Sequence, residues 1–172
     1  MNQPYKILFL CTGNSARSIL GEALATTLSH GRLIGHSAGS EPKQYVHPIT
    51  LKIAREMGYP LELLRSKTWD EFGREDAPHM DFIITVCDSA AGEECPYWPG
   101  HPTTAHWGFI DPENDAINEQ ALWEAFRKVE MELRNRIELL LDLPLDMLDR
   151  LQIKNELHSI HHKLNQQYNL SE

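Results

Sequence analysis

Long hydrophobic runs are missing from this sequence: no apolar run approaches about 18 residues, the length that a membrane-spanning helix needs. We expect no secretory signal peptide in residues 1–6, which lack its apolar segment. Basic residues are few, since 16 lysines and arginines stand against 25 aspartates and glutamates, giving a formal net charge of −9. This charge argues against nucleic acid and against anionic membrane surfaces as partners. We therefore expect a cytoplasmic protein that binds neither.

Cysteine is also scarce. The chain of 172 residues holds three, Cys11, Cys87 and Cys95, which suggests a reducing compartment and catalytic rather than structural thiols. The hydrophobic share of 41% and the charged share of 24% are ordinary for a globular protein. Neither an internal repeat nor a low-complexity segment is present, so a chain of this length is expected to bury a sizeable core in one domain.

Strand-like and helix-like patterns alternate along the chain. Apolar runs predict strands over residues 5–10, 33–38 and 80–86, with a weaker strand over 104–107. Helical spacing predicts helices after the first strand, from Pro48 to Gly58, and over 118–141. This alternation predicts a single three-layer α/β domain, in which a four-stranded parallel sheet carries helices on both faces. The active site should then lie at the carboxyl ends of the strands, where Cys11 and Cys87 both fall.

We expect residues 144–172 to form a helical tail behind a catalytic domain of residues 1–143. Apolar residues between Leu145 and Leu164 permit one more amphipathic helix. Its three histidines, His158, His161 and His162, have a spacing that could hold a metal ion on one helix face. Because no acidic or sulfur partner is obvious, we expect a solvated helix face and no metal.

The stretch CTGNSARS, residues 11–18, is the most informative part of the chain. It follows a buried strand and opens a helix, so the backbone N–H groups of the intervening loop converge on one point, where the helix dipole adds positive charge. Arg17 can curl back as a bidentate fork for a tetrahedral oxyanion. An oxyanion-binding loop is therefore predicted, made by Thr12, Gly13, Asn14, Ser15, Ala16 and Arg17.

Such a loop can turn Cys11 into a nucleophile. A free cysteine with a pKa near about 8.5 is mostly protonated at neutral pH. The helix N-terminus, hydrogen bonds from loop N–H groups and from the Ser18 hydroxyl, and the charge of Arg17 all favour the thiolate. Together they are expected to lower the pKa of Cys11 toward about 6 without any histidine base.

Residues 11–18 resemble the phosphate-binding loop of the low-molecular-weight protein tyrosine phosphatase superfamily, and most of all its arsenate reductase branch. The phosphatase members usually carry a second cysteine directly before the arginine, where this chain has Ala16. The resemblance continues in VCDSAAGEECP, residues 86–96, and in HWGFIDP, residues 106–112. It covers most of the chain from Tyr5 to about Leu141 and implies a reductase of arsenate that uses no cofactor.

The resemblance also implies roles for individual residues. Cys11 is the nucleophile on arsenate or phosphate, and Asp111, in its Asp-Pro pair, is the general acid for the leaving oxygen. Cys87 and then Cys95 relay the resulting disulfide to thioredoxin, or a glutaredoxin–glutathione system supplies the thiol instead. The relay requires the long loop of residues 88–103 to move, because Cys95 must reach a sulfur that has just bonded in the site.

Three alternatives stay open at this point. A protein or small-molecule phosphatase would hydrolyse a phospho-Cys11 with water and would need neither Cys87 nor Cys95. A redox sensor would pair its cysteines in response to peroxide. A zinc site could be assembled from Cys87, Cys95, His101 and His106, although their spacing matches no familiar finger or ribbon.

Several polar residues are expected to support the loop. Asn14 tolerates a left-handed backbone and can bond within its own loop. Glu22 and Ser37 resemble positions that brace the loop in the family, where some members bind a potassium ion. We hypothesise that the ammonium group of Lys67 takes the place of such a cation.

Overall fold

In the computed structural model, the residues described are 3–87, 90, 92, 98–114 and 116–169. The sheet they form has four parallel strands in the order β2-β1-β3-β4. The strands are β1 (Tyr5–Cys11), β2 (Leu33–Gly39), β3 (Phe82–Thr85) and β4 (Thr103–His106). Leu8 of β1 pairs with His36 on one side and with Ile83 on the other, which places β1 in the interior of the sheet. The predicted parallel sheet is confirmed, including the weakest of its four strands.

The α-helices of the described residues are α1 (Arg17–Leu28), α2 (Pro48–Met57), α3 (Asp70–Gly73), α5 (Glu119–Leu141) and α6 (Arg150–Asn169). Sequence signals explain their ends. Pro48 occupies the first turn of α2, and Gly58 ends that helix with a left-handed φ of 82°. The side chain of Asn118 caps α5 by accepting the N–H of Ala121. Among the described residues, no helix combines the length and the apolar character that crossing a membrane requires.

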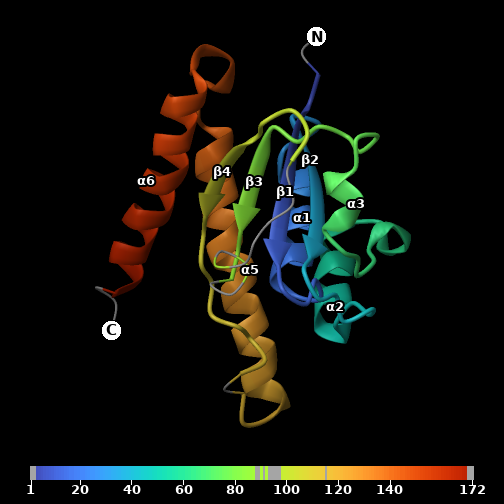
Figure 1. The fold of residues 1–172 in the computed structure, drawn as a ribbon. Coiled ribbons are helices and arrows are strands. Elements are labelled where there is room, and N and C mark those ends of the chain that lie inside the picture. Colours follow the sequence, from blue (N-terminus) through green and yellow to red (C-terminus); the bar gives the residue numbers. More distant parts are fainter. Residues whose placement is uncertain (1–2, 88–89, 91, 93–97, 115, 170–172) are drawn as a thin grey trace.

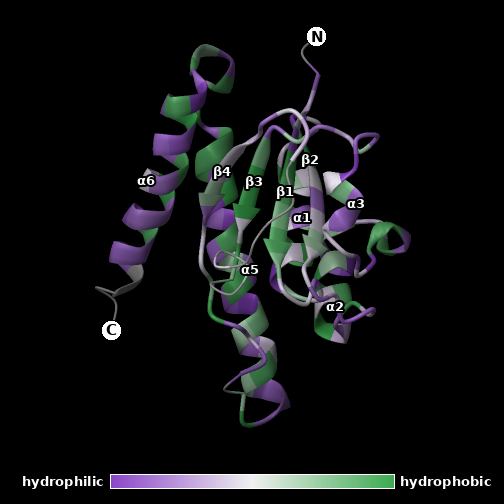
Figure 2. Ribbon diagram, in the orientation of Figure 1, coloured by the Kyte–Doolittle hydropathy of each residue, from purple (hydrophilic) through white to green (hydrophobic). Residues whose placement is uncertain are grey.

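The main core lies between the sheet and the long helices α1 and α5, which run behind the strands in Figure 1. Ile7 and Phe9 point to this face, and Leu20 and Leu24 of α1 meet them there. Alternate residues of β1, Leu8 and Leu10, face the opposite side, where a smaller cluster includes Phe72 of α3. The two interior strands, β1 and β3, are mostly green in Figure 2, the colour of hydrophobic residues. Both faces of the sheet are therefore covered, as the alternation of patterns predicts.

Helix α6 packs along β4 and α5, at the edge of the sheet away from β2 (Figure 1). Its apolar stripe, Ile153, Leu157, Ile160 and Leu164, belongs to the same core as the sheet and α1. In Figure 2 the helix alternates between hydrophilic and hydrophobic residues, as an amphipathic helix does. The tail therefore shares a hydrophobic core with the first 143 residues.

Candidate active site

The loop of residues 11–16, which connects β1 to α1, carries its carbonyl groups on the outside. The carbonyl oxygens of Thr12 and Gly13 accept the N–H groups of Glu41 and Lys43, at 3.0 and 2.9 Å. The carbonyl of Ser15 accepts both the N–H of His47, at 3.1 Å, and the hydroxyl of Thr50, at 3.0 Å. In a trans peptide the C=O and the following N–H point in opposite directions. The N–H groups that follow these carbonyls are therefore turned to the inside of the loop.

Two residues make this tight path possible. Asn14, fully buried, has a left-handed φ of 46°, a conformation that asparagine tolerates better than most residues. Gly39 at the end of β2 lies directly under the loop, where a Cβ atom would come within 2.4 Å of the carbonyl oxygen of Thr12. The expectation that Asn14 takes a left-handed conformation is confirmed, and Gly39 is a second requirement that the sequence pattern did not reveal.

Cys11 ends β1 at the floor of this loop and is 3% exposed. Its Sγ atom accepts the backbone N–H of Asn14 at 3.1 Å and lies 2.8 Å from Oγ of Ser18. The side-chain amide of Asn14 donates to the same Ser18 oxygen at 2.8 Å. Helix α1 begins one residue earlier, at Arg17, with no side chain capping its N-terminus at Ala16. Uncapped N–H groups and the helix dipole therefore add positive potential around the sulfur.

The predicted fall in the pKa of Cys11 is not what the structure gives. Burial raises the pKa of this thiol, and the charge of a Cys87 thiolate would act in the same direction. The hydrogen bonds from Ser18 and Asn14 and the charge of Arg17 lower the pKa, but they offset the desolvation only in part. The expectation of a pKa near 6 is therefore wrong, because it counted the donors and left out the cost of burying the anion.

Arg17 turns toward the segment that follows β4. Its Nη1 atom donates to the carbonyl oxygen of Phe109 at 3.0 Å, and its Nη2 atom lies 3.4 Å from Oδ2 of Asp111. Asp111 is fixed in turn, because its Oδ1 atom accepts the N–H of Glu113 at 3.0 Å. The structure thus brings Asp111 to Cys11 and Arg17, which lie at the two ends of the loop between β1 and α1.

These residues line a cavity of about 390 Å³ whose floor is the loop of residues 11–16. Its rim carries an ion pair between Lys43 and Glu113, with Nζ and Oε2 2.7 Å apart. The same carboxylate lies 3.4 Å from Nε2 of His47. Lys43 crosses the loop so closely that a Cβ atom on Gly13 would lie 3.1 Å from its Cε. No local signal in the sequence marks Lys43, His47 or Glu113, because their contacts join distant segments.

Cys87 follows β3 and is 4% exposed, so the second thiol is also buried at the carboxyl end of the sheet. Its Sγ atom lies 3.6 Å from the hydroxyl oxygen of Thr12, in the loop of residues 11–16, and accepts the N–H of Ala90 at 3.4 Å. Cys11 and Cys87 are both free thiols. Cys95 and half of the segment predicted to move, residues 88–103, lie outside the described residues.

A buried ion pair lies below the loop. The backbone N–H of Lys67 donates to Oδ1 of Asn14 at 2.9 Å, and its Nζ atom lies 3.6 Å from Oε1 of Glu22. Ser37 donates to the same carboxylate oxygen at 2.9 Å. Burial raises the pKa of Glu22 and lowers that of Lys67, and the attraction between the two charges opposes both shifts. The ammonium group of Lys67 therefore lies beside the two residues expected to brace the loop.

The described residues contain no group of three or more His, Cys, Asp or Glu side chains arranged to hold a metal ion. The alternative zinc set includes Cys95, which is not among them. Of the tail histidines, His158 and His162 are exposed as expected. His161 departs from the expected solvated face, because its ring packs 6.5 Å from that of Phe109 and its Nδ1 atom accepts a hydrogen bond from Arg136.

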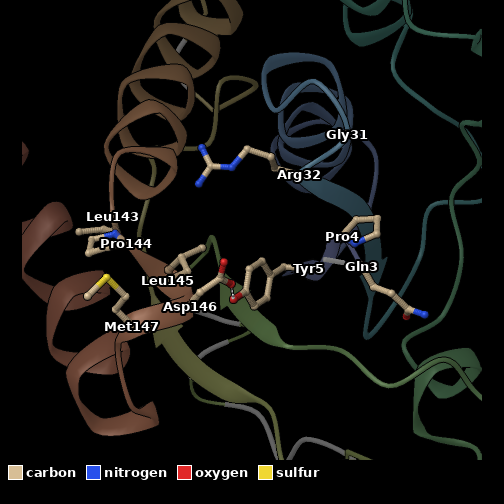
Figure 3. A pocket seen from close by; sticks show the side chains of 10 residues that line it. All are labelled: Gln3, Pro4, Tyr5, Gly31, Arg32, Leu143, Pro144, Leu145, Asp146 and Met147. Atoms are coloured by element: carbon tan, nitrogen blue, oxygen red, sulfur yellow. Dashed lines mark hydrogen bonds between the residues drawn. The ribbon is translucent and has the colours of Figure 1, made fainter. Parts of the chain in front are cut away.

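A separate cavity of about 360 Å³ opens at the amino ends of the strands, between the start of β1 and the connection from α5 to α6 (Figure 3). Tyr5 and Asp146 meet across it in a hydrogen bond, which raises the pKa of the tyrosine to about 12. Arg32 also lines it and donates to the carbonyl oxygen of Leu141 at 2.8 Å. Of the described cysteines, neither Cys11 nor Cys87 lines this cavity, since both lie at the opposite end of the sheet.

Comparison with known proteins agrees with this geometry. Residues 6–157 match the sequence model of the family described as low molecular weight phosphotyrosine protein phosphatase. An arsenate reductase of Bacillus subtilis is 33% identical over 132 residues, which cover 77% of this chain and 91% of that protein.

Two solved structures are similar as well. An arsenate reductase in a phosphate-binding state has a TM-score of 0.62 and 28% identity, over 80% of this chain and 96% of that one. A thioredoxin-dependent arsenate reductase of Corynebacterium glutamicum has a TM-score of 0.55 and 25% identity, over 81% of this chain and 65% of that one. With Cys11 at the floor of the loop of residues 11–16 and a family match over residues 6–157, this chain belongs to the low molecular weight phosphotyrosine protein phosphatase family.

Proposed function

We propose that this protein is an arsenate reductase with Cys11 as its nucleophile. The observation that carries the proposal is the cavity in which Cys11, Arg17 and Asp111 meet, with a second free thiol, Cys87, beside the same loop. The similarity to arsenate reductases at 33% identity supports arsenate as the substrate. A phosphatase needs the first three residues, but hydrolysis by water makes no use of Cys87.

In the first step, the inward N–H groups of Gly13, Asn14 and Ala16 and the guanidinium of Arg17 bind the arsenate oxygens. The guanidinium exchanges its contact with Asp111 for the oxyanion. The Cys11 thiolate attacks arsenic, an S–As bond forms, and one oxygen leaves with a proton from Asp111. The loop donors that lower the pKa of Cys11 become most effective here, because negative charge lies on the sulfur and on the oxyanion together.

In the second step, the thiolate of Cys87 attacks the sulfur of Cys11. An S–S bond forms, the S–As bond breaks, and its electron pair goes to arsenic, which leaves as arsenite. Cys95 then attacks Cys87, forming a Cys87–Cys95 disulfide and releasing the Cys11 thiolate. We propose thioredoxin as the two-electron donor that opens this disulfide, with glutaredoxin and glutathione as the alternative. The similarity to a thioredoxin-dependent arsenate reductase supports thioredoxin.

Hydrolysis of phosphate monoesters is the second candidate, favoured by the family model that covers residues 6–157. The same Cys11, Arg17 and Asp111 would form a phospho-cysteine and pass it to water.

Purified protein should be supplied with arsenate and with thioredoxin or glutaredoxin systems separately, while reductant consumption is followed. Arsenate-dependent consumption that disappears in Cys11→Ser supports the reductase. Rapid hydrolysis of phosphotyrosine, without arsenate reduction by any thiol system, would overturn the reductase and favour the phosphatase function.

A further inference from the structure

Arg136 on α5 is a buried cation, only 1% exposed, outside the cavity that holds Cys11. Its Nη1 atom donates to the carbonyl oxygen of Glu132 at 2.9 Å. The other two nitrogens donate to side chains of α6: Nε donates to Nδ1 of His161 at 3.1 Å, and Nη2 donates to Oδ1 of Asn165 at 2.7 Å. All the guanidinium nitrogens are therefore tied down, and two of them are tied to the C-terminal helix.

The guanidinium of Arg136 also lies over the ring of Phe109. The Cζ atom of Arg136 is 4.9 Å from the centre of the Phe109 ring, within the range of a cation–π contact. The backbone of Phe109 performs a different task, because its carbonyl oxygen accepts the hydrogen bond from Nη1 of Arg17. Its N–H donates to the carbonyl of Val86, next to Cys87, at 3.1 Å. Phe109 thus connects Arg136 to the active-site arginine.

Helix α6 holds the same segment at a second point. The indole N–H of Trp107, which is fully buried, donates to the carbonyl oxygen of Leu157 at 2.9 Å. That carbonyl belongs to the interior of α6, so the contact fixes the segment against the helix backbone itself. Trp107 and Phe109 are two residues apart, and α6 reaches both.

Burying a guanidinium is costly, and an apolar side chain of similar volume would fill the same space without the desolvation penalty. An apolar residue, however, has no hydrogen-bond donors, so it would not fix the position of α6 relative to α5. The family match ends at residue 157, before His161 and Asn165. The contacts of Arg136 with α6 therefore belong to a part of this chain that lies beyond the family match.

We propose that Arg136 is a positioning residue, and that α6 is a brace which sets the place of the Phe109 carbonyl and, through it, of the Arg17 guanidinium. The inference rests on the oxyanion-binding role proposed for Arg17. It gives the C-terminal helix a part in the active site without any contact with substrate.

The test measures binding of inorganic phosphate by calorimetry at 25 °C, together with kcat and KM on an aryl phosphate and the melting temperature. Arg136→Met is expected to weaken phosphate binding about tenfold, which corresponds to about 1.4 kcal/mol. The milder pair Asn165→Leu and Asn165→Asp keeps the fold and separates two causes. The leucine removes the acceptor for Nη2 and should weaken binding, whereas the aspartate keeps an acceptor and should preserve it.

Ile153→Ala is the stability control, because Ile153 packs in the core about two helical turns from His161. It should lower the melting temperature and leave the affinity for phosphate unchanged. Normal phosphate binding by Arg136→Met and Asn165→Leu would overturn the brace, and so would affinity losses that follow the melting temperature in all variants, Ile153→Ala included. Failure of the unmodified protein to bind phosphate would instead overturn the oxyanion role of Arg17, and the brace with it.

Discussion

The hydroxyl oxygen of Ser18 lies 2.8 Å from the sulfur of Cys11 and at the same time accepts a hydrogen bond from the side-chain amide of Asn14. Because the amide occupies a lone pair of the oxygen, the hydroxyl proton is free to point at the sulfur. This arrangement favours the thiolate, since only a deprotonated sulfur accepts two such donors well. It acts against the burial that raises the pKa of Cys11.

Ser18→Ala should therefore raise the pKa of Cys11 further, because the thiolate loses one of the hydrogen bonds that favour it. The rate of Cys11 alkylation by iodoacetamide, followed against pH by peptide mass spectrometry, reports this pKa directly. Ser159→Ala, on α6, is the matched control and should leave the profile in place. An identical profile in Ser18→Ala would mean that the hydroxyl does not stabilise the thiolate.

Phosphate should stabilise the folded protein, because it binds the native loop and not the unfolded chain. At a hundredfold excess over its Kd, the free energy of unfolding should rise by about 2.7 kcal/mol. Arg17→Ala should abolish this increase, and Arg17→Lys should recover only part of it, since a point charge lacks the guanidinium fork. Arg55→Ala, on the exposed side of α2, serves as the charge-matched control. A melting temperature that does not respond to phosphate in the unmodified protein would contradict the oxyanion site.

Much of the fold follows from local patterns. The apolar run of β1 and the helical spacing after residue 17 are local properties, and each produced the element that the structure contains. Cys11 and Ser18 could be assigned to one site because the loop between strand and helix is short. Asn14 was predictable for the same reason, since its unusual φ is a property of the residue type.

The rest of the site depends on contacts between distant segments. Thr50 donates to the carbonyl of Ser15 across 35 positions of the sequence, and Arg17 finds the carbonyl of Phe109 across 92. A backbone carbonyl leaves no mark in the sequence, so neither partner could be identified from residue types. The raised pKa of Cys11 was missed for a related reason, because the degree of burial is set by the whole fold.

Replacing Cys87 by serine separates reduction from hydrolysis. Cys11, Arg17 and Asp111 stay in place in this variant, so hydrolysis of an aryl phosphate should survive within a few fold. Thioredoxin-driven arsenate turnover should collapse, because the Cys11–arsenic adduct then lacks its internal attacking thiol. Reductant consumption measures arsenate turnover, and release of the aryl alcohol measures hydrolysis, both on the same preparation.

Cys95→Ser is the matched variant for the later step of the relay. A single turnover should still release arsenite and then leave a Cys11–Cys87 disulfide, visible as a linked peptide by mass spectrometry. If both serine variants keep full arsenate turnover with glutathione and glutaredoxin, a thiol from solution resolves Cys11 and the internal relay is wrong.

Acid should destabilise the protein through His161. Burial and the nearby charge of Arg136 lower its pKa from 6.5 to about 4, so the folded state holds it neutral where the unfolded chain protonates it. The contribution of neutral His161 to the free energy of unfolding is complete above pH 6.5 and is lost as the pH falls toward 4. After allowance for the partial exposure of His161, we expect this loss to be about 1 kcal/mol. Urea unfolding between pH 5 and 7.5 should show a shallower pH dependence in His161→Gln, with His158→Gln unchanged as the exposed control. Equal slopes in both variants would exclude His161 as the cause.

The ion pair of Glu22 and Lys67 offers the sharpest test of how the oxyanion loop is supported. Lys67→Met leaves the Glu22 carboxylate buried without its cation, so the free energy of unfolding should fall by about 3 to 5 kcal/mol. Glu22→Gln leaves the ammonium group in the same position and should cost a similar amount. The double variant removes both charges and should recover a large part of the loss, because an uncompensated charge is then absent.

Phosphate affinity shows whether Lys67 supports the oxyanion loop or only stabilises the fold. In the double variant the backbone N–H of residue 67 can still donate to Oδ1 of Asn14, so the shape of the loop should survive. Lys67→Met and the double variant should nevertheless both bind phosphate more weakly than the unmodified protein, because both lack the positive charge below the loop. A double-mutant cycle by urea unfolding, with calorimetry on the same four proteins, measures the two effects separately. If the double variant regains both stability and full phosphate affinity, the ammonium group of Lys67 only balances Glu22, and the cation role assigned to it is wrong.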